Sequence, residues 1–310
     1  MMFIRKVKSE GLAHLSYILG DGNEAAVIDP RRDCAVYVDI AAEAGVSIKH
    51  IFETHRNEDY VIGSLDLARR TGAAIHHGGA LDFQYGEATE EDEVFDVGDL
   101  RLQVLETPGH TPESISLKLV DRNYGEEAVG VFTGDVLFVG DVGRTDFFPD
   151  RAKEVAGELY DSIFEKLLPL GDQAILYPAH GAGSVCGDSM ASREFSTLGH
   201  ERRYNPALQQ GGRDEFIVYK VAEHHDQPPY FRRMEKYNQE GAPAMDHLPT
   251  PPPLTPDQLA QAMNKCATVV DLRSPEAFAG AFIPGSLAIP LDMLPAYAGY
   301  LLDYNSDVVL

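Results

Sequence analysis

The stretch THRNEDY, residues 54 to 60, follows a predicted buried strand and places a histidine and two acidic residues in one loop. Three further segments end in the same residue types: TPGHTPES around His110, FTGD ending at Asp135 and YPAH ending at His180. Several strands of such a scaffold end at the same edge. Imidazole and carboxylate side chains that are carried there by different strands form a typical set of metal ligands. A lone histidine on such a loop is more often structural, but four segments favour a metal site. Its candidate ligands are His55, Asp59, His110, Asp135 and His180.

Strand and helix patterns alternate through the first half of the chain. Alternating or continuous apolar runs predict strands, and 3.6-residue periodicity that stops at a glycine predicts helices. The strands are expected at 14–20, 24–30, 48–55, 73–78, 100–110, 114–120, 128–140 and 173–180, and the helices at 34–45 and 61–72. The pattern indicates a scaffold of strands and helices whose loop ends carry the site.

Composition excludes several classes of function. The formal charge is −23, from 49 acidic and 26 basic residues, and such a surface repels nucleic acid and acidic membranes. No run approaches the roughly 20 apolar residues of a membrane span, and the first residues lack the pattern of a secretory signal. Three cysteines are too few for a disulfide framework. We expect a soluble, cytoplasmic protein; its oligomeric state is left open, a homo-oligomer included.

The four segments resemble the metallo-β-lactamase superfamily, over roughly residues 1–240. The resemblance implies an α+β fold, a four-layer αβ/βα sandwich with metals at one edge of two sheets. In its dinuclear zinc hydrolases, such as glyoxalase II, the first motif reads T-H-x-H-x-D-H. Here Asn57 and Tyr60 replace two of the imidazoles. A carboxamide oxygen is a weak zinc ligand and a phenol must lose a proton of pKa about 10, so two zinc ions are not expected.

His55, His110 and Asp135 remain at the first metal position. Two imidazoles and one carboxylate form the facial triad of non-haem Fe(II) oxygenases. Within the superfamily, the persulfide dioxygenases hold iron with the residues at these positions. The segments TPGHTPESISLKL, FTGDVLFVGDVGRTD and YPAHGAGSVCG resemble those members that are fused to rhodanese domains. The resemblance implies an Fe(II)-dependent enzyme that uses O₂ to oxidise the sulfane sulfur of a low-molecular-weight thiol persulfide to sulfite.

The chain changes character after residue 240. Residues 241–256 hold six prolines, which predicts an extended linker. Beyond it, VVDLRSPEAFAGAFIPGSLAIP resembles the opening of a rhodanese module and predicts a strand, a short helix and a second strand. We expect a metallo-β-lactamase-like domain over 1–240, a linker over 241–256 and an incomplete α/β rhodanese-like domain over 257–310. Sulfurtransferase activity is not expected, because the loop of the catalytic cysteine would follow residue 310.

Four residues around the triad have candidate catalytic roles. Asp59 and His180 either orient a metal ligand or, with Asp135, hold a metal themselves. Tyr60 either donates its hydroxyl toward bound oxygen or fills the space of a lost metal. Tyr177, the first residue of the YPAH segment, is a candidate to point its hydroxyl at the metal-bound ligands.

Two residues have candidate roles in substrate binding. The guanidinium of Arg144 suits a substrate carboxylate, and its alternative role is a salt bridge to Asp146 or Asp141. Cys186, in a Gly-rich loop, either carries sulfane sulfur or is an ordinary loop cysteine. Arg56 faces substrate or solvent, and its neighbour Glu58 favours solvent.

Two other functions remain open. The first is a thioester hydrolase with a single zinc, similar to glyoxalase II, in which Asp59 acts as the base. The second is a non-catalytic scaffold whose site has decayed. The replacements Asn57 and Tyr60 favour this hypothesis, and the retained His110 and Asp135 argue against it.

Overall fold

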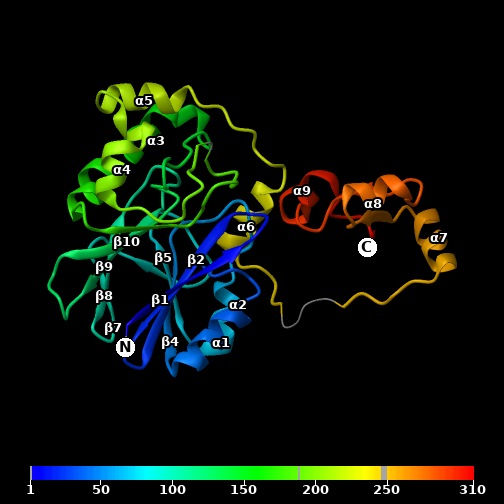
Figure 1. Cartoon of the computed structure of the whole chain (residues 1–310), viewed down its shortest axis with the longest axis horizontal. Helices are drawn as coiled ribbons and strands as arrows, with labels where there is room; N and C mark the ends of the chain where they lie inside the picture. The colour runs from blue at the N-terminus through cyan, green and yellow to red at the C-terminus, as the bar shows by residue number, and fades with distance from the viewer. Residues whose placement is uncertain (1, 188, 246–249) are drawn as a thin grey trace.

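Two β-sheets lie face to face in the first 240 residues (Figure 1). The structure, a computed structural model, describes residues 2–187, 189–245 and 250–310. The first sheet has the order β1-β2-β3-β4-β5-β6 and the second the order β11-β10-β9-β8-β7. The strands are β1 Phe3–Ser9, β2 His14–Asp21, β3 Glu24–Ile28, β4 Ser47–Glu53, β5 Ala74–Gly78, β6 Glu87–Thr89, β7 Val94–Val97, β8 Leu100–Glu106, β9 Ile115–Asp121, β10 Ala128–Gly134 and β11 Ile175–Pro178.

Helices cover the outer face of each sheet. The first sheet carries α1 and α2, through buried residues such as Tyr37 and Leu67, and the second carries α3 to α5, through Leu159, Leu198 and Phe216. The helices are α1 Ala35–Ala44, α2 Ser64–Thr71, α3 Ala152–Asp161, α4 Leu198–Tyr204, α5 Arg213–Val221 and α6 Phe231–Glu240. Short π- and 3₁₀-helical segments lie at Pro149–Arg151, Ser162–Leu167, Leu168–Leu170 and Pro206–Gln209.

The core between the two sheets explains why they pack. Apolar side chains of both inner faces meet there, among them Leu19 and Phe52 from the first sheet and Leu102 and Leu117 from the second. Their alternation with the helix-facing residues gives central strands such as β2, β3 and β9 two buried faces. The expected four-layer αβ/βα sandwich is confirmed.

One predicted strand is shorter than expected, and the difference shapes the site. The apolar run 128–140 predicts a continuous strand, but β10 ends at Gly134, whose φ is +52°. A Cβ at this position would lie 2.6 Å from Thr54 Oγ1, so a side chain does not fit. The left-handed turn, which glycine adopts at little cost, directs Asp135 out of the sheet.

The part of the chain after residue 240 forms a small α/β unit. Residues 241–245 and 250–255 have no helix or strand, in agreement with the predicted linker, whose residues 246–249 lie outside the described ones. The expected strand, helix and strand are present as β12 Thr268–Asp271, α8 Pro275–Gly280 and β13 Leu287–Ala288. The unit also contains α7 Pro256–Asn264, α9 Leu294–Leu301 and β14 Val308–Val309, and both strand pairs are parallel. Its rhodanese-like nature stays a prediction.

The two parts of the chain contact each other where α9 lies beside α6 (Figure 1). Tyr230 and Tyr300 meet edge to face at 5.8 Å, and the guanidinium of Arg233 lies 4.0 Å from the ring centroid of Tyr304. Within the described residues, no helix has the length and apolar character that crossing a membrane requires.

Candidate metal centre

The loop that follows β4 presents His55 in a defined orientation. Asp29 accepts hydrogen bonds of 2.7 Å from both the backbone amide and the hydroxyl of Thr54. Because the Thr54 hydroxyl donates its only proton to Asp29, its oxygen accepts from His55 Nδ1 at 3.0 Å. His55 therefore carries its proton on Nδ1, and the lone pair of Nε2 is free to bind a metal.

His110 reaches the same place from the loop after β8 with the same tautomer. Its Nδ1 donates to the backbone carbonyl of Arg144 at 3.0 Å, and a carbonyl can only accept. The Nε2 atoms of His55 and His110 each lie 3.6 Å from Asp135 Oδ2. All three side chains are buried, and neither Nε2 makes a hydrogen bond.

These three residues fit a metal ion. Their ligand atoms lie within 4.8 Å of one another. Metal–ligand bonds of about 2.1 Å bring two ligand atoms to about 3.0–3.5 Å, close to the separations found here. A buried nitrogen without a partner costs free energy, which an ion between the three side chains would remove. The predicted ligands His55, His110 and Asp135 are thus brought together as a metal-binding cluster.

His180 lies between two carboxylates. Its Nδ1 is 2.7 Å from Asp135 Oδ1, and its Nε2 is 3.0 Å from Asp59 Oδ2. Burial disfavours the imidazolium, but Asp135 and Asp59 raise the pKa of His180 well above its ordinary value. A positive charge thus lies between Asp59 and Asp135, where a second metal would otherwise link them. In this arrangement both His180 nitrogens are engaged by carboxylates.

Asn57 and Tyr60 turn away from metal-ligand roles. The Asn57 side-chain amide donates to the backbone carbonyl of His55 at 3.2 Å. The ring of Tyr60 stacks on His14 at 4.2 Å, and its buried hydroxyl makes no hydrogen bond. Burial raises the pKa of Tyr60 well above its ordinary value, so the phenol keeps its proton. This geometry favours the space-filling alternative for Tyr60.

From the sequence, Glu58 has no predicted role in the site and only favours a solvent-facing Arg56. The structure buries Glu58, which is 1% exposed. Its Oε1 lies 3.2 Å from His110 Nε2 and accepts from Cys186 Sγ at 3.6 Å. Loop residues have no periodicity that would have indicated the inward direction of this side chain.

Cys186 lies beside the cluster, where the sequence suggested a reactive or an ordinary loop thiol. Its sulfur falls within 4.8 Å of ligand atoms of two pairs of residues, the carboxylates Glu58 and Asp135 and the ion pair of Asp59 and His180. Burial, and then Asp59 and Asp135, raise the pKa of the thiol well above its ordinary value. Without a bound cation the residue is therefore a neutral thiol that contacts the ligand cluster.

Arg144 and Tyr177 are placed differently from their predicted roles. The guanidinium of Arg144 is buried, donates twice to Asp146 at 2.7 Å and reaches the carbonyls of Val185 and His225. The alternative role, an ion pair with Asp146, is the one that the structure holds. Tyr177 stacks on Phe132 at 4.8 Å in the core between the sheets. Among the described residues, its hydroxyl makes no hydrogen bond to the metal-binding cluster.

Arg144→Met is expected to lower the free energy of unfolding by about 2–4 kcal/mol, because Asp146 loses its bidentate partner. Urea unfolding measures this change. The control is Arg213→Met, which breaks an exposed bidentate pair with Asp161 and should cost less than about 1 kcal/mol. A variant of Arg144 with unchanged stability and a tenfold higher KM would instead assign the residue to substrate binding.

Asn238, in α6, supports the motif loop from 180 residues away. Its amide donates to the carbonyls of Asn57 and Tyr60 at 2.6 and 2.7 Å, and its Oδ1 accepts from the amide of Ile62. The helix thereby fixes the path of the loop between His55 and α2. Its sequence carries no signal for this role, since a single asparagine in a polar helix is unremarkable by composition.

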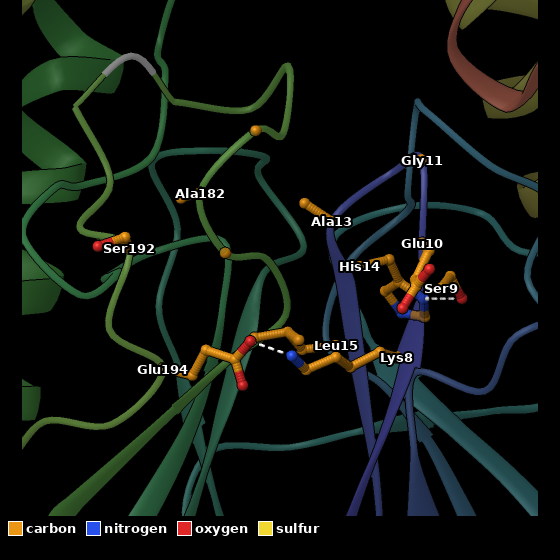
Figure 2. Close-up of a pocket in the computed structure, with 12 residues that line it drawn as sticks. Lys8, Ser9, Glu10, Gly11, Ala13, His14, Leu15, Ala182, Ser192 and Glu194 are labelled. Atoms are coloured by element: carbon orange, nitrogen blue, oxygen red, sulfur yellow. Dashed lines mark hydrogen bonds and ion pairs between the residues drawn. The ribbon is translucent and has the colours of Figure 1, made fainter. Parts of the chain in front are cut away.

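A cavity of about 350 Å³ lies next to the cluster (Figure 2). Its walls come from the β1–β2 turn and from residues 181–183, and the side chains of Lys8 and Glu194 meet across it in an ion pair. His14 contacts both regions, because it lines the cavity and stacks on Tyr60.

Comparisons with known proteins agree with this geometry. Hydroxyacylglutathione hydrolase GloC of Haemophilus influenzae is 29% identical over 215 residues, which covers 62% of this chain and 91% of the relative. Mitochondrial persulfide dioxygenase ETHE1 of Mus musculus is 30% identical over 201 residues, which covers 62% of this chain and 70% of the relative.

Two solved structures extend the likeness. A metallo-beta-lactamase from Staphylococcus aureus is 32% identical with a TM-score of 0.87, and the match covers 99% of this chain and 90% of that one. ETHE1 from Myxococcus xanthus is 29% identical with a TM-score of 0.66, covering 77% and 98%. The model of the metallo-beta-lactamase superfamily matches residues 10–180, more than half of the chain. Because that match contains the strands and loops that carry all five candidate ligands from His55 to His180, the chain belongs to the metallo-beta-lactamase superfamily.

Proposed function

We propose that this protein is an Fe(II)-dependent dioxygenase that oxidises the outer sulfur of a low-molecular-weight thiol persulfide to sulfite. Its superfamily consists of metalloenzymes, and its relatives include a dioxygenase and a hydrolase. One observation carries the choice: the Nε2 atoms of His55 and His110, which have no hydrogen-bond partner, converge on Asp135. His180 meanwhile bonds to both carboxylates that a second metal would need. Two imidazoles and a carboxylate are the ligand set of non-haem Fe(II) oxygenases.

The reaction needs one O₂ and one water for each persulfide. Both oxygen atoms of O₂ and one from water end on the outer sulfur, and the thiol is released with two protons. A ferrous ion held by His55, His110 and Asp135 would supply the electrons that activate O₂ and a position for the substrate sulfur.

The protein itself supplies orientation, a dry environment and a proton. Hydrogen bonds from Thr54 and the Arg144 carbonyl fix the two imidazoles. The side chains of the cluster are nearly inaccessible to water, which strengthens the electrostatic interactions within it. His180 lies between Asp59 and Asp135 and is the candidate donor of a proton to the product.

The test is oxygen consumption by iron-loaded protein with glutathione persulfide or coenzyme A persulfide. Protein purified without oxygen is expected to bind one iron ion per chain, by mass spectrometry of the metal, and to consume one O₂ for each sulfite formed. Absence of oxygen consumption by the iron-loaded protein with both persulfides would refute the proposal.

A mononuclear zinc thioester hydrolase is the second candidate. The resemblance to GloC supports it, and so does Asp59, whose Oδ1 is buried without a partner and is placed to act as a base. Thioester turnover without oxygen by protein that contains one zinc ion would favour this function. A chain that binds neither iron nor zinc would favour the decayed scaffold.

A further inference from the structure

Glu58 is a buried carboxylate that pairs with no lysine or arginine among the described residues, and the nearest ionisable nitrogen is Nε2 of His110 at 3.2 Å. Arg56, two residues before it, forms its ion pair with Glu235 at 3.2 Å instead. Oε2 of Glu58 makes no hydrogen bond, and Oε1 accepts only from the weak thiol donor of Cys186. A buried carboxylate is costly unless hydrogen bonds or a cation compensate it.

The nearest strong polar atom to Glu58 is the metal-facing nitrogen of a candidate ligand. Oε1 lies 3.2 Å from His110 Nε2, yet the two atoms are not aligned for a hydrogen bond. The Nδ1 proton of His110 is donated to a carbonyl, so Nε2 faces the carboxylate either with a lone pair or with a second proton. A lone pair on Nε2 would repel the carboxylate oxygen at this distance, so the contact needs a cation between the two atoms, which is a proton in the metal-free protein or a metal ion.

Asn57, next to Glu58 in the sequence, leaves a ligand position of the metal site open. Asn57, at the position of the missing imidazole, donates its amide to the carbonyl of His55. Glu58, Asp135 and Cys186 have ligand atoms within 4.8 Å of one another, as do His55, His110 and Asp135. Since Asp135 belongs to both groups, the Glu58 carboxylate borders the same ion position.

We infer that Glu58 is a fourth ligand of the metal ion and takes the place that Asn57 leaves open. The ion would then have two imidazoles and two carboxylates from the protein. Two carboxylates neutralise the charge of a divalent ion, whereas the facial triad leaves one positive charge. In an octahedral site, the fourth ligand leaves two positions for other molecules rather than three. The inference rests on the proposed function only in placing a metal at His55, His110 and Asp135.

The test compares Co(II) binding by the full chain and by Glu58→Gln. The metal is removed with a chelator, and Co(II) is then titrated while its visible absorption is recorded. Loss of a group that only supports a ligand costs about 10- to 100-fold in metal affinity, so loss of the ligand itself is expected to weaken Co(II) binding by about 100-fold or more. The absorption bands of bound Co(II) should also shift, because they report the ligand set.

Glu53→Gln is the matched control. Glu53 precedes the motif loop by one residue, is equally buried and is bonded by the Tyr85 hydroxyl rather than placed in the cluster. Burial raises the pKa of Glu53 to about 8, so this acid is neutral like the glutamine that replaces it. The control should keep the affinity and the spectrum of the wild type. Glu58→Gln with wild-type affinity and spectrum would overturn the inference.

A second measurement is independent of the folding of the variant. In crystals of the wild-type protein with bound metal, anomalous scattering places the ion. An ion within about 2.2 Å of a Glu58 oxygen supports the inference, and one more than about 3 Å away overturns it. Oxygen consumption is a separate readout: it tests the proposed function, and it can persist with Glu58 unbound or be absent with Glu58 bound.

Discussion

His110→Ala is expected to abolish the binding of stoichiometric iron and to lower persulfide-dependent oxygen consumption by more than about 100-fold. The reason is that only two ligands of the triad, His55 and Asp135, would remain, and loss of even an indirect partner of a ligand costs about 10- to 100-fold. An oxygen electrode measures the rate with glutathione persulfide, and elemental analysis measures the iron per chain.

His76→Ala is the control for this variant. His76 is also a buried histidine, but it lies on β5 and packs against Phe52 and Phe95 outside the cluster. The folded His76→Ala variant should keep the iron content and the activity of the wild type. Unchanged iron content and rate in His110→Ala would show that the ion binds elsewhere.

His180→Ala is expected to lower the free energy of unfolding of the metal-free protein by about 3–5 kcal/mol. Removal of the imidazolium leaves Asp59 and Asp135 as buried carboxylates without their shared partner, and breaking a buried ion pair on one side costs this amount. Urea unfolding in the presence of a chelator measures the change.

His14→Ala separates the charge of His180 from its volume. His14 is an equally buried histidine next to the cluster, with ring centroids 5.6 Å from those of His180. Burial, followed by the neighbouring His180, lowers the pKa of His14, so its ring is neutral. Both variants remove one imidazole, and only His180→Ala removes a cation. Equal losses of stability would contradict the charged state of His180.

The position of the second metal distinguishes a dinuclear hydrolase from the two candidate functions, both of which use a single ion. A dinuclear hydrolase needs two cations that share a carboxylate, and the protonated His180 supplies the second positive charge without a metal. Because the charge of His180 takes the place of a second metal ion, the missing imidazoles at Asn57 and Tyr60 are compatible with an intact cluster at His55, His110 and Asp135. A single ion with open positions suits an oxygenase or a mononuclear hydrolase, and metal analysis distinguishes them.

The regular elements and the ligand set could be predicted from the sequence. Apolar alternation in strands and 3.6-residue periodicity in helices specify which face of an element is buried, so the individual strands and the residues at their ends were accessible without a structure. The two-sheet sandwich and the choice of His55, His110 and Asp135 as the metal triad came from the resemblance to the metallo-β-lactamase superfamily. Patterns of this kind also indicated the small α/β unit after the linker. The helices of 150–240, which include the supporting Asn238, have no motif that predicts their part in the site.

Tertiary contacts alone decided the direction of the loop side chains. Glu58 points into the cluster, Arg144 turns onto Asp146 and Tyr60 stacks on His14, and in each case the partner is set by backbone dihedrals and by segments distant in sequence. A loop has no repeating period, so neighbouring residues carry no information about which of them faces inward. The chemistry of the metal ligands is therefore local to the motifs, whereas the charge around the ion depends on how the loops pack.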